Sequence, residues 1–119
     1  MKNTTLLAIA LTTFAILPAT ETPAATRIQF ARGSYCGSYS GNFSRGREFV
    51  LRLRGGQILS TRNIGRGTQY NIYVNGPTGT IDGRPVSPNQ IDYPIPRSGD
   101  YYIYIESSTP YSNIEFCAR

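Results

Sequence analysis

The sequence predicts an all-β protein, a small antiparallel β-sandwich of about seven or eight short strands with one disulfide. Three observations support this prediction. Apolar and polar residues alternate in short runs that are rich in β-branched and aromatic side chains, Gly or Pro interrupts the chain roughly every 8–12 residues, and no helical periodicity lasts for two turns. The chain has 119 residues, which suffices for one domain but not for two.

The alternating runs locate the strands. Strands are expected at residues 27–31, 48–54, 57–62, 70–75, 101–106 and 113–117. The run 48–54 is the clearest example, because Phe49, Leu51 and Leu53 would face the core while Arg52 and Arg54 face solvent.

Two connections are also predicted. Gly55-Gly56 has the composition of a two-residue hairpin turn, which would place Ile58 opposite Leu53 on a paired return strand. The segment 75–96 contains five prolines, so it is expected to be irregular loop with one short edge strand near residues 91–93.

The first 25 residues have the organisation of a secretory signal peptide rather than of a folded domain. Lys2 forms the basic start, an apolar stretch covers residues 6–17, and small residues follow. Cleavage after Ala19, Ala24 or Ala25 fits equally well, and the folded domain would then be residues 26–119. An uncleaved anchor is the alternative, although the apolar stretch of about 12 residues is shorter than the roughly 20 that a membrane span requires. The sequence therefore predicts a periplasmic or secreted protein that does not span the membrane.

The two cysteines are consistent with export to an oxidising compartment. Cys36 lies near the start of the expected domain and Cys117 lies near the end of the chain, and in an oxidising compartment such a pair is typical of a disulfide. The bond would close a loop of about 80 residues, worth roughly 4–5 kcal/mol in the chain-entropy treatment. A free, reactive cysteine is the alternative, but no basic residue adjoins Cys36 to stabilise a thiolate.

The composition excludes most catalytic chemistry. The chain has no His, so the commonest general base and the commonest metal ligand are both missing. Asp82, Asp92 and Asp100 are interpreted as solvated side chains rather than as a cation site, and Glu106 and Glu115 occupy outward strand positions instead of forming a catalytic pair. The sequence thus predicts a protein that is not an enzyme and binds no metal or cofactor.

Arginine and tyrosine are the residues left for recognition. The net charge is +5 and every basic residue after position 25 is Arg, while Tyr73, Tyr102 and Tyr104 fall on outward strand positions. Both residue types are enriched in protein interfaces, although Tyr is also an ordinary strand former. Because the arginines are dispersed and the protein is exported, nucleic acid is not an expected partner.

Several segments together resemble a known bacterial family. They are Arg27-Ile-Gln-Phe-Ala-Arg-Gly33, Tyr39-Ser-Gly41, Phe49-Val-Leu-Arg-Leu53 with Gly56-Gln57, Gly76-Pro-Thr-Gly79, and Pro96-Arg-Ser-Gly-Asp-Tyr101. In this order they are similar to the periplasmic inhibitors of g-type and i-type lysozymes, which are small β-sandwich proteins with a signal peptide. The likeness covers nearly all of residues 27–118. Bacterial pre-peptidase C-terminal-like sandwich modules show a similar progression.

The resemblance implies a function and a site. In these inhibitors a Ser-Gly-x-Tyr loop enters the lysozyme cleft, and Ser98-Gly99-Asp100-Tyr101 matches it here. The expected contact residues are Ser98, Gly99, Tyr101 and the neighbouring Arg97, whose guanidinium suits a cleft carboxylate. Tyr101 has a second interpretation, because it shares strand parity with Ile103 and could be a core tyrosine whose hydroxyl bonds to nearby backbone.

A second function stays open at this point. The chain could instead be a non-catalytic sandwich module that binds an acidic polysaccharide or another component of the cell envelope through Arg charge and Tyr stacking. Salt dependence would separate the two functions, because a polyanion binder loses affinity steeply as salt rises, whereas insertion of a loop into a cleft loses little.

Overall fold

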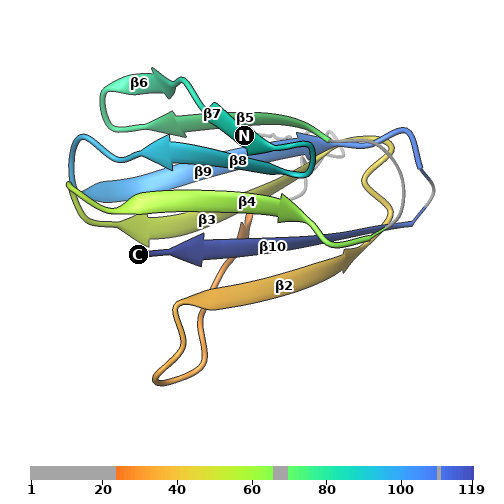
Figure 1. Cartoon of the computed structure of the whole chain (residues 1–119), viewed down its shortest axis with the longest axis horizontal. Coiled ribbons are helices and arrows are strands. Elements are labelled where there is room, and N and C mark those ends of the chain that lie inside the picture. The colour runs from red at the N-terminus through yellow and green to blue at the C-terminus, as the bar shows by residue number, and fades with distance from the viewer. Residues whose placement is uncertain (1–23, 66–69, 110) are drawn as a thin grey trace, which may run out of the picture.

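The computed structural model describes residues 24–65, 70–109 and 111–119, and in these residues it shows two five-stranded sheets and no helix (Figure 1). Sheet 1 has the strand order β1 (Thr26–Arg27), β3 (Arg47–Leu53), β9 (Gly99–Glu106), β5 (Asn71–Gly76) and β6 (Gly79–Ile81). Sheet 2 has the order β2 (Cys36–Gly41), β10 (Ser112–Ala118), β4 (Ile58–Asn63), β8 (Gln90–Pro94) and β7 (Arg84–Ser87). Neighbouring strands are antiparallel except for β1 and β3, which are parallel. The predicted all-β sandwich is therefore confirmed, with a few more short strands than expected.

The core lies between the two sheets and follows the alternation of the sequence. In β3, Phe49, Leu51 and Leu53 are buried while Arg52 is exposed, and Arg54 just after the strand is exposed too. Phe49 packs against Phe116 of β10, with ring centroids 5.1 Å apart, so these rings join the two sheets. The inward and outward positions predicted for this strand are confirmed.

The hairpin predicted at Gly55-Gly56 is wrong. Leu53 pairs with Gly99 in sheet 1, whereas Ile58 pairs with Pro94 in sheet 2. Gly55-Gly56 forms a turn, in which Gly56 has a φ of +93°, but that turn carries the chain from one sheet to the other. An alternating strand buries one face equally well whether its successor is hydrogen-bonded beside it or packed across the core, so the local pattern does not distinguish the two cases.

The proline-rich segment contains more structure than expected. It forms β6, β7 and β8, and β8 is an inner strand between β4 and β7 rather than the predicted edge strand. The true edge is β7, where Pro85 lies beside a shift in register. Proline lacks an amide hydrogen and is tolerated at an edge, which is why this segment accepts prolines and still joins the sheet. Strand β1 is shorter than predicted and ends at Arg27, although Ile28 continues into the core.

The predicted disulfide between Cys36 and Cys117 is confirmed. The two residues are directly opposite each other on β2 and β10, with their Cα atoms 4.1 Å apart. The bond therefore ties the edge strand β2 to its neighbour.

The predicted signal peptide lies outside the described residues except for Ala24 and Ala25. In the part of the chain that the structure describes, no helix is long and apolar enough to cross a membrane.

Candidate functional site

The loop 97–101 lies at one end of the sandwich, where three connections between strands meet (Figure 1, left). They are the β3–β4 turn at residues 54–57, the β5–β6 turn at residues 77–78, and the β8–β9 connection at residues 95–98. Both sheets contribute residues to the surroundings of the loop, because residues 54–57 and 95–98 both connect one sheet to the other. The loop is thus surrounded by elements that are distant in the sequence.

Tyr101 belongs to the core rather than to the surface. Its side chain is fully buried in the unbound protein, and its hydroxyl donates a short hydrogen bond to the backbone carbonyl of Arg97. The ring lies against Gly76 of β5, where an added Cβ would come within 2.1 Å of it. This arrangement matches the second interpretation of Tyr101, a core tyrosine that holds the preceding loop.

Ser98 connects the loop to the turn between the sheets. Its side chain is exposed, and its hydroxyl oxygen accepts a hydrogen bond of 3.0 Å from the backbone N–H of Gly55. A second bond of 2.8 Å runs from the N–H of Gly56 to the carbonyl of Ile95. Because a hydroxyl both accepts and donates, the O–H of Ser98 can still donate to a partner.

Gly99 and Asp100 complete the support of the loop. Gly99 has a φ of +155°, and a Cβ at this position would lie 2.6 Å from the side chain of Pro77. The carboxylate of Asp100 forms an ion pair with Arg27 of β1, at 3.3 Å. Both contacts reach residues more than 20 positions away in the sequence, so the loop is held from two further elements.

Arginines predominate around the loop. Arg97 and Arg54 are exposed beside it, and Arg52 is the register partner of Asp100 on the outer face of sheet 1. Arg27 also lies beside the loop, where it pairs with the carboxylate of Asp100. The loop therefore presents a positively charged surface to an incoming partner.

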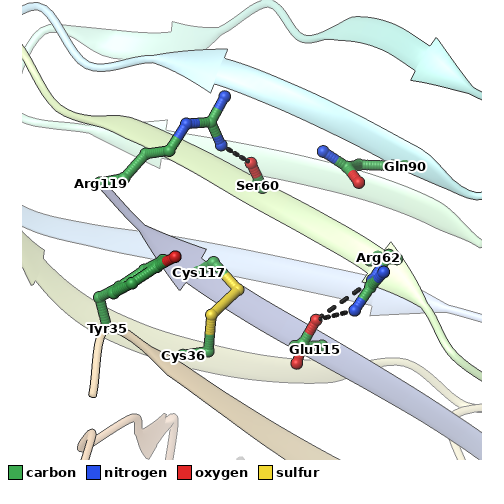
Figure 2. A pocket seen from close by; sticks show the side chains of 8 residues that line it. All are labelled: Tyr35, Cys36, Ser60, Arg62, Gln90, Glu115, Cys117 and Arg119. Carbon is green, nitrogen blue, oxygen red and sulfur yellow. Dashed lines mark hydrogen bonds and ion pairs between the residues drawn. A yellow bond between two sulfur atoms is a disulfide. The ribbon is translucent and has the colours of Figure 1, made fainter.

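The outer face of sheet 2 has a separate hollow around the disulfide, about 290 Å³ in volume (Figure 2). Its charged residues are already paired: Arg62 contacts Glu115 at 2.6 Å and Arg119 contacts Asp92 at 3.2 Å. Cys36 and Cys117 flank Glu115, but they are joined to each other and so supply no thiolate for a metal.

Asp92 beside this hollow has a shifted pKa. Burial by itself would raise the pKa of this carboxyl, but hydrogen bonds from Gln90, Ser60 and Arg119 and the charge of Arg119 outweigh burial and hold the pKa below its ordinary value of 3.8. The carboxylate of Asp92 accepts hydrogen bonds within a network that also links β4 and β8. A role in stabilising the sheet follows from these contacts.

The bond from the hydroxyl of Tyr101 to nearby backbone was one interpretation of the sequence, but the long-range contacts that hold the loop were not predicted. The contacts of Ser98 with Gly55, of Gly99 with Pro77 and of Tyr101 with Gly76 all cross between segments whose spatial relation depends on the strand order. The only signal in the sequence is the presence of Gly76 and Pro77 in the segment that resembles the inhibitor family.

Comparisons with solved structures agree with this architecture. The chain superposes on PliG from Salmonella Typhimurium, a periplasmic inhibitor of g-type lysozyme, with a TM-score of 0.64 and 16% identity over 82% of this chain and 100% of that one. It shares the fold of these inhibitors. A PliG mutant from Escherichia coli gives a TM-score of 0.61 with 18% identity, covering 80% of this chain and 97% of that one.

The second resemblance is confirmed as well. The pre-peptidase C-terminal domain of a collagenase from Bacillus anthracis superposes with a TM-score of 0.57 and 14% identity, covering 84% of this chain and 99% of that domain. No protein-family model and no curated protein sequence matches the chain. At these identities the likeness establishes the fold, and function has to be argued from the site.

Proposed function

We propose that this protein is a non-enzymatic inhibitor of lysozyme, of the g-type or i-type, that inserts residues 97–101 into the cleft of the enzyme. The observation that carries the proposal is the rigid support of an exposed loop. Ser98 is bonded to Gly55, the carbonyl of Arg97 is bonded to Tyr101, and Gly99 packs on Pro77. A loop that is already ordered loses little conformational entropy when it docks, so more of its contact energy appears as affinity.

The residues of the loop take different roles in this proposal. Arg97 and Ser98 are exposed and make the contacts, the guanidinium with a cleft carboxylate and the hydroxyl with a polar group of the enzyme. Gly99 has no side chain, so the loop can pack closely on Pro77 and keep its shape. Tyr101 is buried, and its proposed part in recognition is to hold the carbonyl of Arg97 and thereby the shape of the loop.

The charge of this surface restricts the partner. The exposed arginines beside the loop would repel a strongly basic enzyme and attract one with an acidic cleft rim. The proposed target is therefore a lysozyme of low isoelectric point.

The proposal includes a location outside the cytoplasm. Residues 1–25 have the order of regions that a signal peptide requires, and the Cys36–Cys117 bond is of the kind that persists in oxidising compartments. N-terminal sequencing of the exported protein should find a start between Thr20 and Thr26. Recovery of exported material that still begins at Met1 would contradict cleavage.

A panel of c-, g- and i-type lysozymes assayed with the purified protein tests the function. At least one class should be inhibited, and Arg97→Gln should weaken that inhibition by about tenfold, the loss expected for a charge-assisted contact. Arg84→Gln is the matched control, because Arg84 is exposed on β7 of the other sheet. Absence of inhibition of every class would reject the proposal, and equal effects of the two variants would reject the loop as the site.

A further inference from the structure

The outer face of sheet 1 carries a group of tyrosines that the proposed inhibition does not use. Tyr73 of β5 and Tyr104 of β9 are directly paired, with ring centroids 6.4 Å apart, and Tyr102 lies two residues along β9 on the same face. Tyr73 is 53% exposed and Tyr102 is 42% exposed. We name these three residues the tyrosine face.

Hydrogen-bonding side chains surround the tyrosine face. Asn75 is the register partner of Tyr102, and its carbonyl oxygen accepts a bond of 2.8 Å from the hydroxyl of Thr80, which leaves its amide hydrogens able to donate outward. Asn71 lies two residues before Tyr73 on the same strand and is also exposed. Rings and amides therefore alternate along β5, while Glu106 of β9, the register partner of Asn71, adds a carboxylate to the same face.

A groove adjoins the tyrosine face at Tyr104, and its far side is formed by Thr26 and by Ala24, which belongs to the predicted signal peptide. Arg45, Arg47 and Glu48 line it, and the hydroxyl of Tyr104 lies over Gly46, where a Cβ would come within 1.9 Å. The guanidinium of Arg47 donates to the hydroxyl of Thr26 at 3.3 Å. Arg45 is exposed, and none of the ion pairs found among the described residues involves it.

The hydroxyl of Tyr104, at the edge of the groove, is protonated at neutral pH. Desolvation, with smaller effects from Glu106 and Tyr73, raises the pKa of its hydroxyl above the ordinary value of 10.0. The hydroxyl therefore keeps its proton at neutral pH, and it is hydrogen-bonded to Glu106 on the same strand.

We propose that the tyrosine face and the adjoining groove bind a glycan strand that carries carboxylate groups. A pyranose ring presents C–H groups on its faces and hydroxyls at its rim, so it can pack on Tyr73 and Tyr102 while Asn71 and Asn75 bond to its hydroxyls. A carboxylate of the strand would then pair with Arg45, in keeping with the net charge of +5.

The composition of the face favours a glycan over a protein partner. The centre of a protein interface is depleted of charged side chains, whereas Glu48 and Glu106 lie beside Tyr104 on this face. The exposed aliphatic side chains among the described residues, Ile64 and Val86, lie outside sheet 1, and Val50 beside Tyr102 is only 5% exposed. The surface thus offers no continuous apolar patch for a protein to cover.

The proposed glycan surface begins beside the loop 97–101, because Tyr102 directly follows Tyr101, and it extends away from the loop toward Tyr104. Gly99 begins β9 and Tyr104 lies five residues further along it, a separation of about 17 Å in an extended strand. Tyr73→Ser and Arg45→Gln, which change residues at the Tyr104 end of this surface, are therefore expected to leave lysozyme inhibition unchanged, so either function can fail without the other.

Polygalacturonate, a polymer of carboxylated pyranoses, and its fully methyl-esterified form are suitable probes in calorimetric titrations with the purified protein. We expect binding to the acid and clearly weaker binding to the ester. Tyr73→Ser and Tyr102→Ser should each weaken binding about 5- to 10-fold, and Arg45→Gln should remove the preference for the acid over the ester. Circular dichroism and thermal melting establish that each variant is folded.

Matched controls exist on the rest of the molecule. Tyr35 and Tyr111 are exposed outside sheet 1, at 59% and 68%, and Arg84 is exposed on β7. Tyr35→Ser, Tyr111→Ser and Arg84→Gln should change the affinity by less than about twofold, as surface residues outside a binding site do. Equal losses in the controls, equal affinity for acid and ester, or no binding would overturn the proposal. A dimer in analytical ultracentrifugation that Tyr73→Ser dissociates would also overturn it, because the face would then join two copies of the chain.

Discussion

The hydroxyl of Tyr101 donates a hydrogen bond to the backbone carbonyl of Arg97, four residues earlier, from a side chain that is fully buried. This bond fixes the exposed loop to the core of the sandwich. The shape of the candidate recognition loop is therefore determined by a residue that is not itself on the surface.

Tyr101→Phe should separate the ring from the hydroxyl. The ring stays in the core, so the variant should fold, but loss of one hydrogen bond should lower the free energy of unfolding by about 1 kcal/mol. Inhibition should weaken together with order in the loop, as urea unfolding and lysozyme assays would show. If Tyr101→Phe matches the wild type in both measurements, the bond to Arg97 has no part in holding the loop.

Ser98→Ala should affect function more than stability. The change removes the acceptor for the N–H of Gly55, but that amide lies at an exposed turn and water can replace the serine. Inhibition should fall by about tenfold, because an unpaired polar group left on the enzyme costs roughly 1–3 kcal/mol. Ser108→Ala, at an exposed position in the β9–β10 connection, is the control and should inhibit normally. Full inhibition by the Ser98→Ala, Tyr101→Phe double variant would show that another surface is the site.

Gly76→Ala tests the contact that positions Tyr101. The new methyl would lie 2.1 Å from the ring, which has no room to move within the core, so the free energy of unfolding should fall by roughly 3 kcal/mol or more. Gly33→Ala is the comparison, because Gly33 has a φ of +81° but open space around it, and only the backbone cost of about 1–2 kcal/mol applies. Similar losses in the two variants, measured by urea unfolding, would contradict the steric account.

Removal of the disulfide should destabilise the domain substantially. Cys36→Ser with Cys117→Ser should lose about 2–5 kcal/mol of unfolding free energy, the range typical of small secreted domains. Reduction of the wild type with dithiothreitol should lower its stability to that of the double variant. Two titratable thiols in native protein would show that the bond does not form.

The hydrogen bonds to Asp92 predict a dependence of stability on pH. Its pKa is lowered in the folded state, so this carboxylate stabilises the fold above the ordinary value of 3.8, and the contribution is lost as pH falls through the lower folded value. Asp92→Asn lacks this titration. The difference in unfolding free energy between wild type and variant should therefore be larger at pH 7 than at pH 3, and an equal difference at both values would contradict the assignment.

The alternation of residues was enough to predict which side chains of a strand face the core. Phe49, Leu51 and Leu53 are buried as expected, because the side chains of any strand alternate between two faces regardless of its neighbours. The disulfide was also predictable, because the chain has only two cysteines and they can pair only with each other. The position of the candidate loop came from the Ser98 to Tyr101 motif.

The partner of each strand was decided only by the tertiary structure. Gly55-Gly56 looked like a hairpin, yet it joins two sheets, and β8 became an inner strand. These choices depend on the packing of both sheets across one core, which involves residues far apart in the sequence. The same long-range packing brings Gly55, Gly76 and Pro77 to the loop 97–101. By itself the sequence determined the strand faces, the disulfide and the motif, while the support that orders the motif arose from the strand order.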